Sequence, residues 1–181
     1  MTRARGRAGP MRPFERSLPM QLMRAREIVM ARFRPHLHAH GLTDQQWRIV
    51  RALNEVAELD MMELGARCCI HPASLSRILP RLEDEGLLRR RTSREDQRRV
   101  IVSLAPRGRQ LFADVAPESE AIYAAITREI GTERLEAVYA VLDDVIRTLS
   151  GTSPQREAGK ITGVPKNFAA KRAMPSAKRG R

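Results

Sequence analysis

The sequence predicts a mainly α-helical fold that carries one small β-hairpin. Apolar residues recur every three or four positions through most of residues 18–149, which is the spacing of one helix face. Between residues 87 and 104 this spacing changes to alternation, with Val100, Val102 and Leu104 on the same side of the chain. Alternation of this kind is typical of a strand that is buried on one side.

A long first helix is expected to run to about Gly41, because glycine commonly ends helices. Its apolar face comprises Leu18, Leu22, Ala25, Val29, Phe33 and Leu37. A second helix begins at Thr43, which has the spacing of a capping box with Gln46; in a capping box each side chain bonds the other residue's backbone N–H. The buried face of this second helix comprises Trp47, Val50 and Leu53, with Val56 as a further candidate.

Two further short helices follow. Asp60 and Glu63 repeat the capping-box spacing and start a third helix that runs through Leu64 to Cys68. A fourth helix starts near Pro72, a residue suited to the first helical position, and stops at Gly86. Its apolar residues are Leu75, Ile78, Leu79 and Leu82. Pro80 inside it removes one helical hydrogen bond at a cost of about 3 kcal/mol, so we expect a kink or a shortened helix.

The hairpin is predicted from two strands at residues 87–91 and 99–104, joined by the polar segment 92–98. A long helix is expected over residues 108–130, with a bend at Pro117, and a last helix over residues 133–149. In that last helix an apolar seam with the spacing of a coiled coil is formed by Leu135, Val138, Leu142, Val145 and Leu149.

The formal net charge of +12 is unevenly distributed. Residues 1–13 carry +4 and residues 151–181 carry +7. Both segments contain few large apolar residues, a composition that does not bury enough surface to offset the entropy of ordering, so we expect two disordered basic tails. Between the tails, residues 71–109 carry +5 and residues 110–150 carry −5. The positive field is therefore focused on the fourth helix and the hairpin.

Three short helices followed by a hairpin describe a winged helix-turn-helix, in which the last of the three helices enters the DNA major groove and the hairpin, or wing, reaches the backbone and minor groove. We expect this domain at residues 42–105, with a helical dimerisation region at residues 14–41 and 106–150. The predicted DNA contacts on the fourth helix are Ala73, Ser74, Ser76, Arg77 and Arg81, and those on the wing are Arg94, Asp96, Arg98 and Arg99. Arg77 is the expected specificity residue, since a guanidinium can bridge the two acceptors of guanine. A surface ion pair with Asp84 or Glu85 is the alternative role for Arg77.

Three stretches carry a resemblance to a known family: "LTDQQWRIVRAL", "HPASLSRILPRLEDEGLLRRR" and "EDQRRVIVSLAPRG". Together they resemble the MarR family of bacterial regulators over residues 18–149. The resemblance implies a triangular homodimer whose first and last two helices interlock. It also implies that Asp96 orients the wing loop and that Arg98 enters the minor groove. The family commonly has Thr where Ala105 stands, which leaves the cap of the following helix open.

A finer likeness lies in "RAREIVMARFRPHL" and "ARCCIHPASLSRIL", which are similar to the branch that includes HpaR-type repressors of homoprotocatechuate degradation. This likeness implies a repressor that leaves a pseudo-palindromic operator when a small aromatic or heteroaromatic acid binds, such as homoprotocatechuate or a hydroxynicotinate. An Arg can pair with the carboxylate, and an indole or imidazole can stack on or hydrogen-bond the ring. The expected ligand residues are Arg26, His36, His40 and Trp47. Arg26 as a dimer-interface ion pair and Trp47 as plain core are the alternatives.

Two other functions compete with this interpretation. Cys68 and Cys69 precede the DNA-reading helix, beside Arg67 and His71, and a thiolate stabilised by positive charge can act as a redox sensor. Buried packing is the alternative role for these thiols. The basic tails suggest a nucleoid-type protein that coats DNA without sequence preference.

Several classes are not expected. The sequence has no nucleophile elbow, phosphate-binding glycine loop or H-E-x-x-H motif, so we predict neither an enzyme nor a cofactor. His36 and His40 share a helix face, but no third metal ligand follows from the sequence, so no metal is expected. No apolar run reaches 18 residues, and the two cysteines form no disulfide framework. We therefore expect a cytoplasmic protein without a membrane partner.

Overall fold

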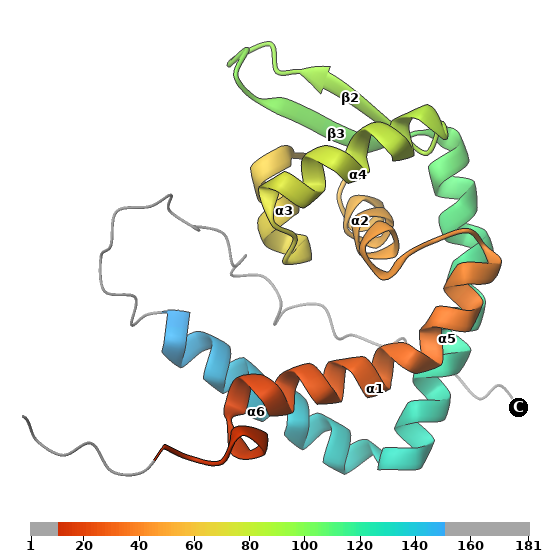
Figure 1. The fold of residues 1–181 in the computed structure, drawn as a ribbon. Helices are drawn as coiled ribbons and strands as arrows, with labels where there is room; N and C mark the ends of the chain where they lie inside the picture. Colours follow the sequence, from red (N-terminus) through yellow and green to blue (C-terminus); the bar gives the residue numbers. More distant parts are fainter. Residues whose placement is uncertain (1–10, 151–181) are drawn as a thin grey trace, which may run out of the picture.

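The computed structural model describes residues 11–150 of the chain. It contains a winged domain and a set of long helices that extend from one side of it (Figure 1). The helices and strands of the winged domain are α2 (Asp44–Glu55), β1 (Glu58–Asp60), α3 (Met61–Cys68), α4 (Pro72–Asp84), β2 (Leu88–Thr92) and β3 (Val100–Leu104). The remaining elements are the 3-10 helix η1 (Phe14–Arg16) and the helices α1 (Leu18–Ala39), α5 (Pro106–Ile130) and α6 (Thr132–Ser150). The predicted fold class is confirmed, whereas most residues of the two predicted basic tails lie outside the described residues.

Both predicted capping boxes are confirmed. At the start of α2 the Gln46 N–H donates to Thr43 Oγ1 at 3.3 Å, and the Thr43 N–H donates to Gln46 Oε1 at 2.9 Å. At the start of α3 the same two bonds join Asp60 and Glu63 at 2.8 and 3.2 Å. These local bonds satisfy backbone donors that a helix start otherwise leaves unpaired.

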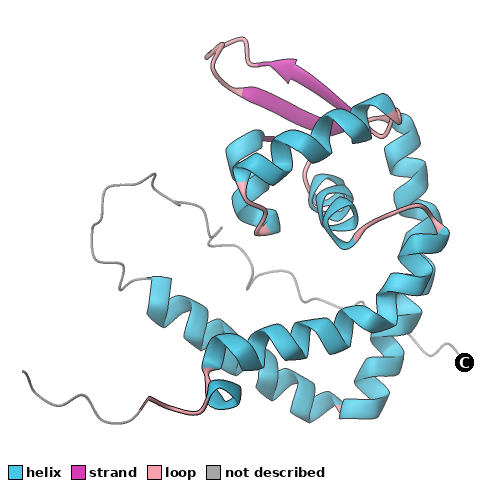
Figure 2. Cartoon of the chain, in the orientation of Figure 1, coloured by secondary structure: helices cyan, strands magenta, loops and turns pink. Residues whose placement is uncertain are grey.

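The sheet contains one strand more than the predicted hairpin (Figure 2). Strand β3 lies between β1 and β2, and both pairings are antiparallel, with Leu59 opposite Val102 and Leu88 opposite Leu104. The side chains of Val102, Leu88 and Leu104 are buried and join the sheet to the core. That core also includes Ile49, Leu64, Leu75, Leu79 and Leu82 from the three helices.

Of the two effects expected of Pro80, a kink or a shortened helix, the shortening is wrong. Helix α4 continues through Pro80 to Asp84. Leu79 and Leu82, on either side of the proline, are fully buried, so their packing holds the helical backbone although one hydrogen bond is missing.

Helix α5 starts close against the sheet. Its N-cap residue Ala105 makes no side-chain cap bond, and Pro106 occupies the first position, where no N–H is needed. A Cβ atom at Gly108 would lie 2.1 Å from the Leu87 carbonyl oxygen, so only glycine allows this approach. The first turn of α5 is therefore joined to the winged domain.

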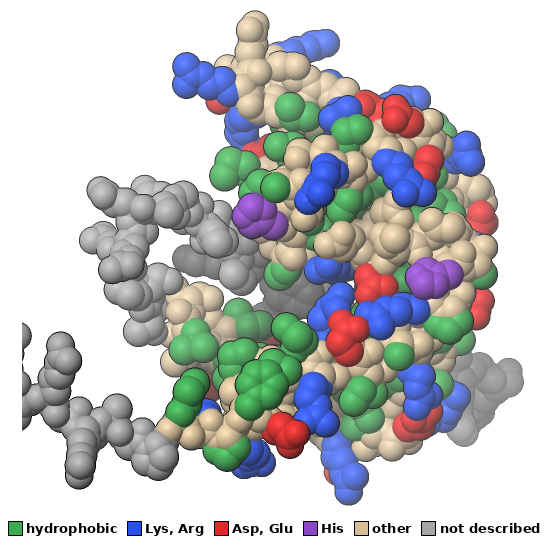
Figure 3. Space-filling view, viewed as in Figure 1, with side chains coloured by type: hydrophobic (Ala, Val, Ile, Leu, Met, Phe, Trp, Pro, Cys, Tyr) green, Lys and Arg blue, Asp and Glu red, His purple; other side chains and the backbone are tan. Residues whose placement is uncertain are grey.

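The apolar face of α1 divides into two parts. Phe33 and Leu37, in its C-terminal half, are buried in the core, whereas Leu18, Leu22 and Val29 are exposed. Helix α6 likewise exposes Val138, Tyr139, Val141, Ile146 and Leu149. In Figure 3 the hydrophobic side chains near the N-terminus of α1 form a visible group at the lower left. The described chain thus leaves much of its predicted dimerisation region uncovered.

Candidate DNA interface and effector cavity

The N-terminal turns of α4 present the predicted recognition residues to solvent. Nδ1 of His71, the N-cap residue, accepts a hydrogen bond from the Ala73 N–H at 3.3 Å. Ser76 Oγ and Arg77 Nε both donate to the Ala73 carbonyl, at 3.1 and 3.2 Å. Arg77 therefore forms neither of its alternative ion pairs within the described residues, and its terminal guanidinium nitrogens are left available for DNA. Arg81 instead pairs with Glu85 at 3.0 Å.

The tip of the wing is shaped by local hydrogen bonds. Asp96 Oδ1 accepts from the Arg98 backbone N–H at 2.9 Å, and Ser93 Oγ accepts from the N–H groups of Glu95 and Asp96. This geometry is consistent with a loop-orienting role for Asp96. Arg94 and Arg98 are exposed and form no ion pair within the described residues. Arginine side chains stand out around the wing at the top of Figure 3.

Other arginines at the base of the wing are paired with acids of the winged domain. Arg90 pairs with Glu83 of α4, Arg91 pairs with Glu58 of β1, and Arg99 pairs with Asp60. Arg99 is thus in the predicted DNA-contacting set but is held within the protein. These pairings are not visible in the sequence, because the partners lie 7 to 39 positions apart.

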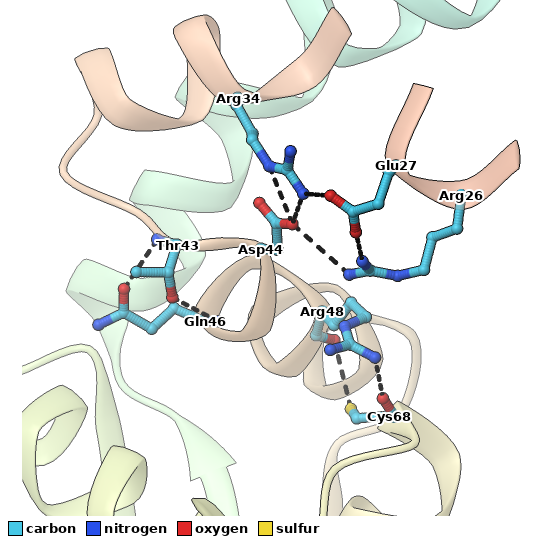
Figure 4. A network of polar contacts seen from close by, with 8 residues as sticks. All are labelled: Arg26, Glu27, Arg34, Thr43, Asp44, Gln46, Arg48 and Cys68. Carbon is cyan, nitrogen blue, oxygen red and sulfur yellow. Dashed lines mark hydrogen bonds and ion pairs between the residues drawn. The ribbon is translucent and has the colours of Figure 1, made fainter. Parts of the chain in front are cut away.

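Arg26, expected to bind an acid, belongs to a charged network between α1 and α2. It lies 2.5 Å from Glu27 and 3.5 Å from Asp44, and Arg34 contacts the same two carboxylates. Figure 4 shows these four side chains pointing toward one another. The hydrogen bond from Arg34 lowers the pKa of Glu27. Arg26 is therefore already engaged by protein carboxylates in this chain.

Neither predicted histidine lines a cavity with Trp47: His36 joins α1 to α5, and His40 contacts His36. His36 is buried, and its Nε2 donates to the Val115 carbonyl at 3.0 Å. Its Nδ1 lies 2.9 Å from a Glu118 oxygen, without the alignment of a hydrogen bond. The His40 ring packs edge-on against His36 at 4.9 Å. No group of three or more metal-ligand side chains is found among residues 11–150.

Trp47 lies at a small cavity between the winged domain and α5. The Trp47 ring stacks on Phe112 with 5.6 Å between centroids. The cavity, of about 70 Å³, is lined by these two rings together with Arg51, Glu55, Ala116, Ser119 and Glu120. Ser119 Oγ is buried and has no hydrogen-bond partner within the described chain. A cation, an aromatic wall and an unpaired hydroxyl meet here, which is the donor set that binds an aromatic acid.

Arg51 and Ser119 are not among the ligand residues predicted from the sequence. An arginine on an amphipathic helix has the same pattern as any solvent-facing residue, and only the packing of α5 against α2 gives it a cavity to line. Arg51 is held there by Tyr123, whose hydroxyl accepts from Nη1 at 2.8 Å. The role of Arg51 therefore depends on a contact with a residue about 70 positions away, which a short stretch of sequence does not show.

A larger groove of about 530 Å³ lies on another part of the same junction, beside His40. Its charged lining residues include two cations, Arg81 and Arg107, and two acids, Glu85 and Asp114. These opposite charges offset one another, so the groove shows no preference for an anion. The residues that line the smaller cavity suit an aromatic acid better.

The structure gives the two cysteines different environments. Cys68 is buried, its Sγ donates to the Arg48 carbonyl at 3.5 Å (Figure 4), and burial raises the pKa of the thiol to about 11. Cys69 is exposed and ends α3 in a left-handed conformation. Because a reactive cysteine needs a stabilised thiolate, Cys68 has the properties of a packing residue.

Comparison with known proteins agrees with this geometry. Residues 40–99 match the model of the MarR family. The chain is 41% identical over 119 residues to the HTH-type transcriptional regulator FarR of Neisseria gonorrhoeae, an alignment that covers 66% of this chain and 82% of that protein. It is 38% identical over 130 residues to the homoprotocatechuate degradative operon repressor of Escherichia coli, covering 72% and 88%.

A solved structure extends the comparison. The crystal structure of NadR in complex with 4-hydroxyphenylacetate is similar with a TM-score of 0.66 and 36% sequence identity, covering 80% of this chain and all of that one. The two relatives compared by sequence are named as a transcriptional regulator and an operon repressor. No helix within residues 11–150 combines the length and apolar character that crossing a membrane requires.

Proposed function

Since the chain belongs to the MarR family, we propose that it is a dimeric transcriptional repressor that a small aromatic acid releases from its operator DNA. Two relatives support the repressor and ligand classes: one represses a homoprotocatechuate degradative operon, and NadR binds 4-hydroxyphenylacetate. Because the operator DNA of a bacterium lies in the cytoplasm, we propose that location for the protein. Operator binding also assigns the chain a binding function rather than an enzymatic one.

The cavity beside Trp47 is the main support for an aromatic acid as the ligand. Arg51 supplies a guanidinium for the carboxylate, the stacked rings of Trp47 and Phe112 supply a flat wall, and Ser119 supplies an unpaired hydroxyl. Of the predicted ligand residues, Trp47 stays in the proposed site, and Arg51 takes the carboxylate instead of Arg26. His36 is assigned to the contact between α1 and α5, and His40 to the contact with His36.

Binding must enlarge this cavity. Its volume of about 70 Å³ is less than half of the roughly 150 Å³ apolar cavity that accommodates benzene. An aromatic acid therefore separates Phe112 on α5 from Trp47 on α2. A ligand that binds the separated arrangement better shifts the population toward it, by no more than its differential affinity for the two arrangements.

The dimer follows from the uncovered apolar faces. Helices α1 and α6 both expose apolar side chains, which form surfaces of the kind that protein partners bury. They are Leu18, Leu22 and Val29 on α1, and Val141, Ile146 and Leu149 on α6. A two-fold dimer places its two α4 helices in successive major grooves, about one helical turn apart. A change in the angle between α2 and α5 alters that spacing and releases the DNA.

The experiment that tests the proposal is a fluorescence-anisotropy titration on the DNA upstream of the protein's own gene, with random DNA as competitor. 4-Hydroxyphenylacetate, homoprotocatechuate and 6-hydroxynicotinate are then added separately. We expect preferential binding that one of these acids reverses. Equal binding to random DNA would instead favour a nonspecific coating protein. Preferential binding that ignores every acid and is lost on mild oxidation would favour a cysteine sensor.

A further inference from the structure

The six arginines between residues 89 and 99 form two structural groups. Arg89, Arg94 and Arg98 form no ion pair within residues 11–150, whereas Arg90, Arg91 and Arg99 each pair with an acid on a different element. We infer that Arg90, Arg91 and Arg99 are positioning residues that fix the wing relative to the recognition helix, and that DNA contact belongs to the unpaired group. The inference rests on the proposed DNA-binding function.

Arg90 joins the wing directly to the recognition helix. Its backbone N–H donates to Glu83 Oε1 at 3.1 Å, and its Nε donates to Glu83 Oε2 at 2.7 Å. Glu83 lies in the last turn of α4, and both side chains are about one-third exposed. Because main chain and side chain are both held, this contact fixes strand β2 against α4.

Arg99 joins the other strand to the helix that precedes recognition. Its Nη2 donates to Asp60, whose side chain is only 10% exposed. The same carboxylate caps α3, and Asp60 pairs with Ile101 in the sheet. Burial alone would raise the pKa of Asp60, but hydrogen bonds from the Glu63 N–H and from Arg99 lower it. One carboxylate therefore joins α3, β1 and the base of β3.

Arg91 spans the sheet. It lies on β2 opposite Ile101, and its Nη2 reaches both carboxylate oxygens of Glu58 on β1 at 2.8 and 2.9 Å. Since β3 separates these two strands, the pair joins the two edges of the sheet across its centre. Both side chains are about half exposed, so this pair is weaker than the other two.

The carboxylates of Glu83 and Asp60 distinguish a positioning role from simple repulsion of DNA. A carboxylate near a DNA-binding surface repels phosphate, so neutralising it strengthens DNA binding if proximity is its only effect. Neutralising a carboxylate that positions the wing weakens binding instead. The two roles thus predict changes of opposite sign for the same one-unit change in charge.

Asp84 offers a matched control for this comparison. It follows Glu83 on α4, is exposed, and forms no ion pair within the described chain. Operator and random-DNA affinities of full-length Glu83→Gln, Asp60→Asn and Asp84→Asn are to be measured side by side. Asn caps helices about as well as Asp, so Asp60→Asn removes the ion pair and keeps the cap. Thermal unfolding of each variant shows whether it remains folded.

We expect operator binding to weaken about two- to fivefold in Glu83→Gln and Asp60→Asn, a size typical of partly exposed pairs, and to stay equal or strengthen in Asp84→Asn. Binding that strengthens in all three variants would show that the acids only repel DNA and would overturn the inference. The double variant Glu83→Gln with Arg90→Gln should bind as Glu83→Gln does. A further loss in the double variant would assign Arg90 a DNA contact.

Salt dependence separates the two groups of arginines. Each phosphate contact that is lost reduces the slope of log affinity against log salt by about one. Arg98→Gln should reduce this slope, whereas Arg99→Gln should weaken binding at an unchanged slope. Equal reductions in the two variants would contradict the division.

Amide hydrogen exchange tests the positioning role without DNA. Residues 88–104 should exchange faster in Glu83→Gln and Asp60→Asn than in the parent and in Asp84→Asn. Unchanged exchange in a folded Glu83→Gln would overturn the inference. A parent chain that binds no DNA specifically would refute the proposed function, and the exchange result would still decide whether these pairs hold the wing.

Discussion

The guanidinium of Arg51 is held against Tyr123, with Nη1 donating to the tyrosine hydroxyl at 2.8 Å and the guanidinium carbon 5.6 Å from the ring centroid. Arg51 lies on α2 and Tyr123 on α5, so this contact crosses the boundary between the winged domain and the long helices. It orients a cation at the edge of the cavity before any ligand binds. An oriented cation binds a carboxylate with a smaller loss of side-chain entropy.

Replacing Arg51 should uncouple the acid from the DNA. Arg51→Gln is expected to keep operator affinity and to require at least about tenfold more acid for release, since hydrogen bonds to charged groups contribute roughly 1.5–3 kcal/mol. Competition anisotropy with 4-hydroxyphenylacetate measures this. Arg26→Gln is the matched control and should respond to the acid as the parent does. A larger loss of the acid response in Arg26→Gln would instead assign the binding of the ligand carboxylate to Arg26 on α1.

Tyr123→Phe should weaken the acid response less than Arg51→Gln does. The variant keeps the ring under Arg51 but removes the hydroxyl that accepts its hydrogen bond. We expect an increase of about three- to tenfold in the acid concentration needed for release, since a single hydrogen bond contributes about 1 kcal/mol. Calorimetric titration of the acid gives the affinity directly. An acid affinity equal to that of the parent would show that Tyr123 has no part in orienting Arg51.

Ser119→Ala should leave the free energy of unfolding unchanged or increase it slightly. The hydroxyl is buried without a partner, and such a group costs about 1–3 kcal/mol, so its removal is expected to be neutral or stabilising. Chemical denaturation compares this variant with the parent, and acid affinity should fall. A stability loss above about 1 kcal/mol would mean that Ser119 bonds something in the free protein.

The contribution of Asp60 to stability should depend on pH. The folded state lowers the pKa of this carboxyl below its ordinary value of 3.8. The stabilisation is therefore present above that value and is lost as the pH falls through the lower folded pKa. The unfolding free energies of the parent and Asp60→Asn should differ at pH 7 and converge as the pH falls below 3.8 and through the lowered folded pKa of Asp60. A constant difference across this range would contradict the ionised pair with Arg99.

Alkylation should distinguish the two cysteines. With a pKa of about 11, Cys68 at pH 7 is thiolate in only about one molecule in ten thousand, and it is also buried. Iodoacetamide on the native protein, followed by peptide mass spectrometry, should modify Cys69 and leave Cys68 unmodified until urea is added. Modification of Cys68 at the rate of Cys69 under native conditions would restore the redox hypothesis.

Local patterns predicted the helices well, and long-range packing explains what they missed. The capping boxes at Thr43 and Asp60 involve residues three positions apart, so the sequence shows both partners together. Strand β1 spans only Glu58–Asp60 and has no alternation of its own; it exists because β3, more than 40 residues later, pairs with it. Tertiary partners of this kind are not visible in a short sequence window.

The functional residues likewise divide into those that local sequence indicates and those that long-range packing determines. The clustered arginines of the wing predicted a cationic surface, but which of them remain unpaired depends on Glu58, Asp60 and Glu83. Trp47 was predicted as a ligand residue from its type. Arg51 became apparent only when α5 supplied Phe112, Ser119 and Tyr123 around it.

Pro117 gives α5 the mechanics of a lever. Gly108 ties the first turn of this helix to the sheet, and Pro117, lacking an N–H, leaves the Ala113 carbonyl without its helical bond. Ala116 and Ser119, on either side of the proline, line the cavity. Enlargement of the cavity therefore acts on α5 where the helix lacks a hydrogen bond. A small change in the helix angle at this point produces a larger displacement of the wing, because the wing lies further away.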